Sequence, residues 1–492
     1  MRTNVEAGRG VRSRVVWVIV LACVVIGGWA AMGVRVSADA QASAQAPASS
    51  VAGPWSGQIS LPPGPLNIAV VLTVDAAGAW TGTIDIPAQG ARGVALADVS
   101  VEGRAVSFAM AGVPGDPRFS GTIGDDGQSM GGTFTQGPAS FPFELRRGAL
   151  TYVRPQEPKA PFPYRVADVT YRNEAAGITL AGTLTVPQGA GPFPAVLLIT
   201  GSGAQDRDSA VMGHKPFLLW ADTLTRQGIA VLRVDDRGVG GTGRGTVQPT
   251  SLDFAGDVRA GLTFLASRPE IDATRLGLIG HSEGANIAAT VAADDPRVRF
   301  IVMLAGSGVR GDALLLEQFS ALAASQGAPQ AMIDWQLAIR RAVYAQLIAE
   351  TDGAPNQAAR QAILENLPPV PGTGDTEPGR QLATELFESA NAWIRYFLAA
   401  DPRDALSRVK VPVLALIGER DLQIPADDNI PAIRAALATA GNTDATVRAM
   451  PGLNHLFQTA KTGLPGEYEQ IEETIAPSVL SLVGEWLGER VR

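Results

Sequence analysis

The segment Gly280-His281-Ser282-Glu283-Gly284 constrains the fold of this 492-residue chain more than any other feature. It follows the apolar run at residues 276–279 and precedes the helix-forming residues 285–289. At such a strand-to-helix turn the serine backbone is strained, and a side chain at either glycine position would crowd the neighbouring strand or helix. The pattern therefore predicts a sheet that holds Ser282 out at its carboxyl edge as a nucleophile.

The first 40 residues predict a signal peptide or a membrane anchor. Four arginines precede the apolar run at residues 15–34, and small residues follow at 38–40. We expect export to the periplasm or the extracellular space, with the leader removed or retained as an inner-membrane anchor through residues 15–34. The single cysteine, Cys23, lies inside this run, so the mature chain is expected to contain no disulfide. Residues 41–53, rich in Ala, Ser, Gln and Pro, predict a flexible linker.

Residues 54–147 predict an all-β domain. Leu66, Ile68 and Val70 alternate with other residues, as do positions 80–86, and glycine-rich turns separate about seven or eight short strands. A small barrel or a sandwich would close such a meander. We interpret the unit as a structural or oligomerising module; a ligand cavity or a carbohydrate-binding surface is the alternative. The oligomeric state does not follow from the sequence.

Residues 155–492 predict a mostly parallel sheet flanked by helices. After a proline-rich connector, strand-like segments at 195–200, 230–234, 276–279, 300–305, 411–417 and 446–450 alternate with helical segments at 217–227, 254–267, 285–293 and 475–487. A helical excursion at about 308–406 interrupts this alternation and predicts a cap over the active site.

A nucleophilic serine needs a base and an orienting carboxylate, and the chain has only three histidines. His281 lies inside the elbow and must point away from the serine, and His214 precedes a helix at the wrong place in the chain. His455, in the loop after the last strand, is the predicted base. Asp421, in the loop after residues 411–417, is the predicted acid, and Glu419 is the alternative.

Backbone amides should stabilise the negative charge that develops on the substrate oxygen. The Glu283 N–H is one expected donor, and the amide of Ser202 or Gly203 is the other. Asp206-Arg207-Asp208 is expected to order this loop through ion pairs. The segment 235–240 lacks the spacing of a phosphate-binding loop, so we interpret it as structural.

Metal ions, cofactors and nucleic acids are not expected as partners. Three dispersed histidines and one cysteine cannot form a zinc site without the predicted base. The net charge of -8 and the absence of a basic tract past residue 40 argue against nucleic-acid binding.

Four separated motifs resemble those of the EstD-like carboxylesterases of the α/β-hydrolase superfamily. They lie at residues 200–208, 235–240, 280–284 and 393–397, within a resemblance that covers about residues 165–490. The resemblance implies an α/β-hydrolase fold and hydrolysis of short acyl esters, with Ser282, Asp421 and His455 as the triad. Ala204 departs from it, because proline is expected there. The β unit resembles a module often fused ahead of such hydrolases.

Two other functions stay open from the sequence. A serine aminopeptidase or amidase could use the same triad with a cap that selects the substrate. A non-catalytic binding protein on a hydrolase scaffold is the alternative of another class, although every triad position holds a competent residue.

Overall fold

The computed structural model describes residues 51–491, apart from 62–63, 88–90, 111, 114, 246–247 and 351–352. The predicted signal peptide or anchor at residues 1–40 lies outside the described residues, as does the linker up to residue 50. Within the described part, the helices are all too short or too polar to cross a membrane.

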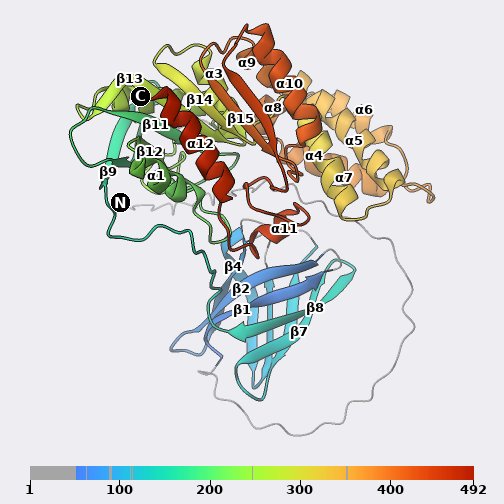
Figure 1. Ribbon diagram of the computed structural model, residues 1–492. Coiled ribbons are helices and arrows are strands. Elements are labelled where there is room, and N and C mark those ends of the chain that lie inside the picture. Colours follow the sequence, from blue (N-terminus) through green and yellow to red (C-terminus); the bar gives the residue numbers. More distant parts are fainter. Residues whose placement is uncertain are drawn as a thin grey trace, which may run out of the picture.

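An eight-stranded antiparallel barrel forms the N-terminal unit, in which β8 pairs with β1 to close the cylinder (Figure 1). Its strands are β1 (Gly53–Leu61), β2 (Gly64–Val74), β3 (Trp80–Ile86), β4 (Ala91–Glu102), β5 (Ala105–Met110), β6 (Arg118–Ile123), β7 (Ser129–Gln136) and β8 (Ala139–Arg147). The Phe119 ring fills the interior, with its centroid 4.7 Å from those of Phe108 and Phe134. The closed barrel is thus the correct one of the two predicted architectures, and its core is packed with side chains.

A second, eight-stranded sheet forms the rest of the molecule, in the order β16-β15-β14-β13-β11-β12-β10-β9. Its strands are β9 (Arg165–Asn173), β10 (Ile178–Val186), β11 (Phe193–Ile199), β12 (Ala230–Val234), β13 (Ile271–His281), β14 (Val298–Leu304), β15 (Val413–Gly418) and β16 (Ala445–Met450). Strands β11 to β16 run parallel to one another, and β10 is antiparallel to both β9 and β12. The alternation predicted this mostly parallel sheet, and the family resemblance implied the α/β-hydrolase architecture that it forms.

Helices cover both faces of this sheet, so its central strands are buried on both sides. The helices outside the cap are α1 (Pro216–Arg226), α2 (Ser251–Ala266), α3 (Glu283–Ala292), α10 (Ala426–Thr439), α11 (Pro465–Tyr468) and α12 (Pro477–Arg490). In β11, Leu197 and Ile199 pack into one core, whereas Val196 and Leu198 pack into the other. An apolar run without alternation is the consequence of such double burial.

Helix α2 begins three residues earlier than the sequence predicted. Thr250 precedes it, and the Asp253 side chain accepts the Thr250 backbone N–H at 2.8 Å in a capping box. The capping residues Thr250 and Asp253 therefore set the start of the helix, ahead of Phe254, where the sequence predicted it.

A helical insertion lies between β14 and β15 and projects beyond the end of the sheet (Figure 1). It contains α4 (Gly311–Ser325), α5 (Gln330–Ala349), α6 (Gln357–Glu365), α7 (Glu377–Ser389), α8 (Ala392–Ala399) and α9 (Pro402–Leu406). The insertion has a core of its own around Trp335, Ile339 and Phe387. It occupies the region in which the cap was predicted.

Candidate active site

Ser282 occupies a strained turn between β13 and α3. Its φ of 56° and ψ of -123° are unusual for a residue with a side chain. A Cβ at Gly280 would lie 2.0 Å from the Gly284 carbonyl oxygen, and one at Gly284 would lie 2.2 Å from that of Ile199. Both glycines are therefore required by close backbone approach, as the sequence pattern predicted. The Ser282 N–H donates to the Leu304 carbonyl at 2.8 Å, which fixes the turn against β14.

Asp421 and His455 meet in a buried hydrogen bond. His455 Nδ1 lies 2.8 Å from Asp421 Oδ2, and the two residues are 4% and 3% exposed. The other carboxylate oxygen, Oδ1, accepts the backbone N–H groups of Gln423 and Ile424, each at 2.8 Å. The carboxylate is thus held by its own loop and oriented toward the imidazole.

Glu419, the alternative acid, lies elsewhere. Its side chain accepts the Gly452 N–H at 2.9 Å and is exposed. It connects the loop after β15 to the loop after β16. The structure therefore brings Asp421, and not Glu419, together with His455.

The other two histidines have lowered pKa values. His281 Nε2 donates to the His455 carbonyl at 2.9 Å, and its ring packs against that of His455 at 4.8 Å between centroids. Burial lowers the pKa of His281 to about 4. His214 is fully buried beside Thr474 and Tyr468, and burial lowers its pKa to about 4 as well. The hydrogen bonds of these two rings go to other groups, and the imidazole partner of Asp421 is His455.

The predicted oxyanion loop is attached to the end of β12 by Asp236. Thr200 Oγ1 donates to Asp236 Oδ1 at 2.6 Å, and the Gln205 N–H donates to Oδ2 at 2.8 Å. A Cβ at Gly201 would lie 3.1 Å from that of Ser282, so the loop runs directly beside the elbow. Gly203 has a φ of +95°, which favours glycine. Both candidate amides, Ser202 and Gly203, follow Gly201 on this loop.

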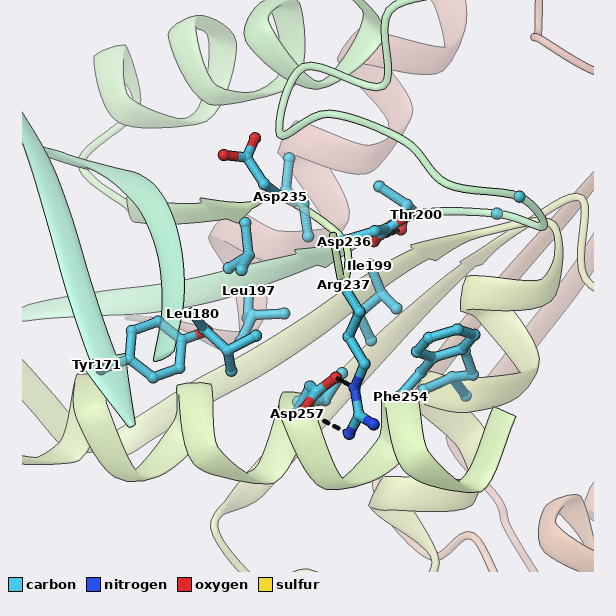
Figure 2. Close-up of a pocket in the computed structure, with 16 residues that line it drawn as sticks. Tyr171, Leu180, Leu197, Ile199, Thr200, Asp235, Asp236, Arg237, Phe254 and Asp257 are labelled. Atoms are coloured by element: carbon cyan, nitrogen blue, oxygen red, sulfur yellow. Dashed lines mark hydrogen bonds and ion pairs between the residues drawn. The ribbon is translucent and has the colours of Figure 1, made fainter. Parts of the chain in front are cut away.

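The first two residues after β12 hold the segment at residues 200–208, and the third holds α2. Asp235 binds Arg207 through Oδ2 at 2.7 Å. Arg237 binds Asp257 on α2 at 2.6 Å, as Figure 2 shows. Burial raises the pKa of Asp236 to about 7 despite the hydrogen bonds it accepts. The predicted ion pairs of Arg207 and Asp208 thus run mainly to other segments, since Asp208 pairs with Arg233 on β12. The sequence pattern predicted a structural role for residues 235–240, but it did not predict that they bind the oxyanion loop.

The Glu283 side chain is a feature that the sequence analysis missed. Its Oε1 accepts Ser251 Oγ at 2.5 Å and Trp393 Nε1 at 2.9 Å, and Ser202 also interacts with the carboxyl. Burial raises the pKa of this carboxyl. One side chain next to the nucleophile thus joins the cap, the start of α2 and the oxyanion loop. Its partners are distant in the sequence, so no local pattern signals them.

A cavity of about 50 Å³ lies beside the oxyanion loop (Figure 2). Thr200, Gly201 and Asp236 line it together with apolar residues of the sheet and α2, whereas Ser282 and His455 do not. Its volume suits a few water molecules rather than an ester. In the part of the chain that the structure describes, no cluster of His, Cys, Asp and Glu side chains has the size needed to bind a metal ion.

Comparisons with known proteins find similarity to hydrolases. A family model described as serine aminopeptidase, S33, matches residues 217–367. Esterase EstD of Thermotoga maritima is 26% identical over 314 residues, which make up 63% of this chain and 65% of EstD. Esterase FrsA of Escherichia fergusonii is 32% identical over 130 residues, 26% of this chain and 29% of FrsA. The chain thus spans less than two thirds of the length of either relative.

Comparison with solved structures finds matches of low similarity. The esterase Pf2001 of Pyrococcus furiosus has a TM-score of 0.39 and 16% identity, covering 70% of this chain and 100% of that chain. A similarity of this size supports no argument about activity.

Topology and sequence similarity together define the class of fold: the chain has an α/β-hydrolase fold. Its homology is with the EstD and FrsA esterases, and a closed β-barrel precedes its hydrolase unit. The resemblance deduced from the four motifs is therefore confirmed.

Proposed function

We propose that the chain is a serine hydrolase that cleaves carboxylic esters, with short acyl chains, through an acyl-enzyme on Ser282. The observation that supports it most is the buried hydrogen bond between Asp421 and His455. The residue before the strained Ser282 also contacts the His455 carbonyl. The esterase names of EstD and FrsA support the choice of an ester substrate.

In the proposed mechanism, His455 Nε2 takes the proton of Ser282 Oγ as that oxygen attacks the ester carbonyl carbon. Asp421 holds the imidazole through Nδ1–H. The Glu283 N–H and the amide of Ser202 or Gly203 donate to the oxyanion. Collapse of the tetrahedral intermediate expels the alcohol with the proton from His455. Water then hydrolyses the acyl-enzyme by the same route and releases the acid, and no cofactor takes part.

The decisive test is Ser282→Ala. We expect loss of p-nitrophenyl ester turnover and of fluorophosphonate labelling, with unchanged circular dichroism. Ser325→Ala is a matched control, because the Ser325 hydroxyl bonds only within α4, to the Leu322 carbonyl. Turnover retained in Ser282→Ala would contradict the proposal. A series of p-nitrophenyl esters from acetate to laurate tests the preference for short acyl chains.

The family model favours a second candidate, a serine aminopeptidase or amidase with the same triad. The esterase would cleave an ester bond, and the aminopeptidase or amidase would cleave an amide bond. Turnover of an aminoacyl amide, with p-nitrophenyl acetate inert and Ser282 still labelled, would select the peptidase. Absence of both labelling and turnover would instead indicate a binding protein on a hydrolase scaffold.

We also propose that residues 1–40 direct export to the periplasm or the extracellular space. The arginines followed by an apolar run support this. Fractionation of the producing cell followed by intact-mass measurement tests it. A shortened chain in the periplasm or the medium would show removal of the leader, and a full-length chain in the membrane fraction would show anchoring through residues 15–34. A full-length chain in the cytoplasm would contradict export.

A further inference from the structure

One segment of the hydrolase unit lies between the barrel and the acid–base pair. It comprises α11 and the residues that follow it, up to Ile475. In Figure 1, α11 lies between the barrel and the larger sheet. We call residues 465–475 the bridging segment.

The barrel and its connector bind the bridging segment at Glu469. Asn67 Nδ2, on β2, donates to Glu469 Oε2 at 2.7 Å, and the Tyr152 hydroxyl donates to Oε1 at 2.5 Å. Glu469 is only 6% exposed. The Arg154 guanidinium donates to the Glu469 carbonyl at 2.8 Å and to the Met212 carbonyl at 2.7 Å. Both oxygens of this carboxylate are therefore held from outside the hydrolase sheet.

The connector also holds the far end of the bridging segment. Gln156 Oε1 accepts the N–H groups of Thr474 and Ile475 at 2.6 and 3.1 Å. Its Nε2 donates to the Ile475 carbonyl at 2.8 Å. Contacts from the N-terminal side thus fix the segment at two places.

On its other side, the bridging segment reaches the two catalytic loops through Tyr468. This side chain is 3% exposed, and its hydroxyl accepts Gln423 Nε2 at 3.2 Å and faces the backbone N–H of His455. The N–H of Gln423 is one of the two amides that hold Asp421. Tyr468 therefore touches the acid loop and the base loop, and Glu469 is the next residue in the chain.

A buried polar network connects the same segment to the residue before the base. His214 contacts Thr474 Oγ1 at 2.9 Å, the Tyr468 carbonyl at 3.0 Å and Gln458 Nε2 at 2.9 Å. Gln458 in turn exchanges hydrogen bonds with the Asn454 side chain, each at 2.9 Å. His214, Gln458 and Asn454 are all fully buried. Because these side chains are buried and in contact, a displacement of the bridging segment can reach the residue before the base.

We propose that Tyr468 and Glu469 are positioning residues through which the N-terminal barrel sets the geometry of the Asp421–His455 pair. The barrel is then part of the support of the active site rather than an appended module. The inference rests on the proposed triad, because a positioned base matters only if His455 acts as one.

The test uses the full chain with Asn67→Ala and Tyr152→Phe combined, which removes both donors to the Glu469 carboxylate. We expect kcat for a p-nitrophenyl ester to fall about tenfold with KM within about twofold, since the base and not substrate binding is disturbed. Rates are expressed per active site titrated with a fluorophosphonate, so that loss of folded protein does not count. Thr73→Ala is the matched control, because Thr73 lies on the same strand as Asn67, β2, and the substitution removes only its hydrogen bond to Thr81 on β3; it should change neither constant.

Tyr468→Phe tests the other side of the segment. We expect it to lower kcat about fivefold, and less in the Asn67→Ala/Tyr152→Phe background, because the substitutions act along one path. A double variant with the kcat per active site of the control would overturn the inference, even if it melted at a lower temperature. Ester turnover that survives Ser282→Ala would instead overturn the proposed function, so the two failures are distinguishable.

Discussion

The two halves of the candidate active site are held by different parts of the molecule. The nucleophile half comprises Ser282, Glu283 and the loop at residues 200–205. Its backbone shape comes from the elbow glycines, and its outer contacts go to the cap and to Asp236. The acid–base half comprises Asp421 and His455, on two separate loops. Its outer contacts go through the bridging segment toward the barrel.

This difference shows why the two halves need different support. A single turn between a strand and a helix determines the place of the serine, because the close approaches at Gly280 and Gly284 leave few alternatives. A hydrogen bond between two loops depends on the position of both loops, and Tyr468 contacts both of them, although amides of its own loop hold the Asp421 carboxylate. Substitutions in the contacts between the barrel and the bridging segment should therefore lower kcat by disturbing the acid–base half. Substitutions in the contact between the cap and the nucleophile half should instead change substrate binding.

The largest expected effect distinguishes Asp421, the proposed acid, from its neighbour Glu419. Asp421→Asn should lower kcat by about 10⁴-fold, because the amide no longer holds the required imidazole tautomer. Steady-state turnover of a p-nitrophenyl ester measures this. Glu419→Gln is the control, since that side chain binds only the Gly452 N–H. The assignment of the acid is wrong if Glu419→Gln is the damaging change.

The elbow and the sheet could be predicted because their signals are local. Residues 276–279 are buried on both faces of the sheet, and the glycines of the elbow are needed within five positions of one another. His455 could be selected because only three histidines exist and two were in unsuitable places. These deductions use chain order and short-range sterics, which the sequence displays directly.

The supporting contacts could not be predicted, because they join distant segments. The Glu283 carboxyl meets Trp393, 110 positions away, and Asn67 meets Glu469, 402 positions away. Glutamate, tyrosine and asparagine at such places resemble ordinary surface residues in the sequence. Only the packing of the cap and the barrel against the sheet shows that these side chains are buried and paired.

Asp236, which holds the oxyanion loop of the nucleophile half, should make the free energy of unfolding of the protein decrease as pH rises. Burial raises the pKa of Asp236 to about 7, above its unfolded value, so the folded state binds this proton more tightly. The resulting stabilisation is complete below about pH 4 and is lost as pH rises through 7. Asp236→Asn keeps a neutral side chain, so its free energy of unfolding should gain about 2–3 kcal/mol relative to the wild type between pH 5 and 8. Urea unfolding at both pH values measures the difference, and a constant difference would contradict the shift.

His214, in the buried network next to the acid–base half, should change the free energy of unfolding with pH in the opposite direction. Burial lowers the folded-state pKa of His214 to about 4, so the unfolded chain binds this proton more tightly. Stability is then complete above about pH 6.5 and is lost as pH falls toward 4. His214→Asn should be less stable than the wild type at pH 7 but should lose about 2 kcal/mol less on transfer to pH 5. Parallel losses in the two proteins would show that His214 does not titrate in this way.

The smallest expected effect tests whether the cap acts on the nucleophile half through Glu283. Trp393→Phe removes the N–H that binds Glu283 Oε1 but keeps the ring that stacks on Phe397. One lost hydrogen bond should raise KM for the longer acyl esters about fivefold and leave kcat nearly unchanged, because the cap moves while the elbow does not. Trp335→Phe is the matched control, since its N–H binds the Pro368 carbonyl inside the cap. If kcat falls equally for acetate and for longer esters, the Trp393–Glu283 contact shapes the oxyanion loop instead, and the nucleophile half then depends on distant support as much as the acid–base half does.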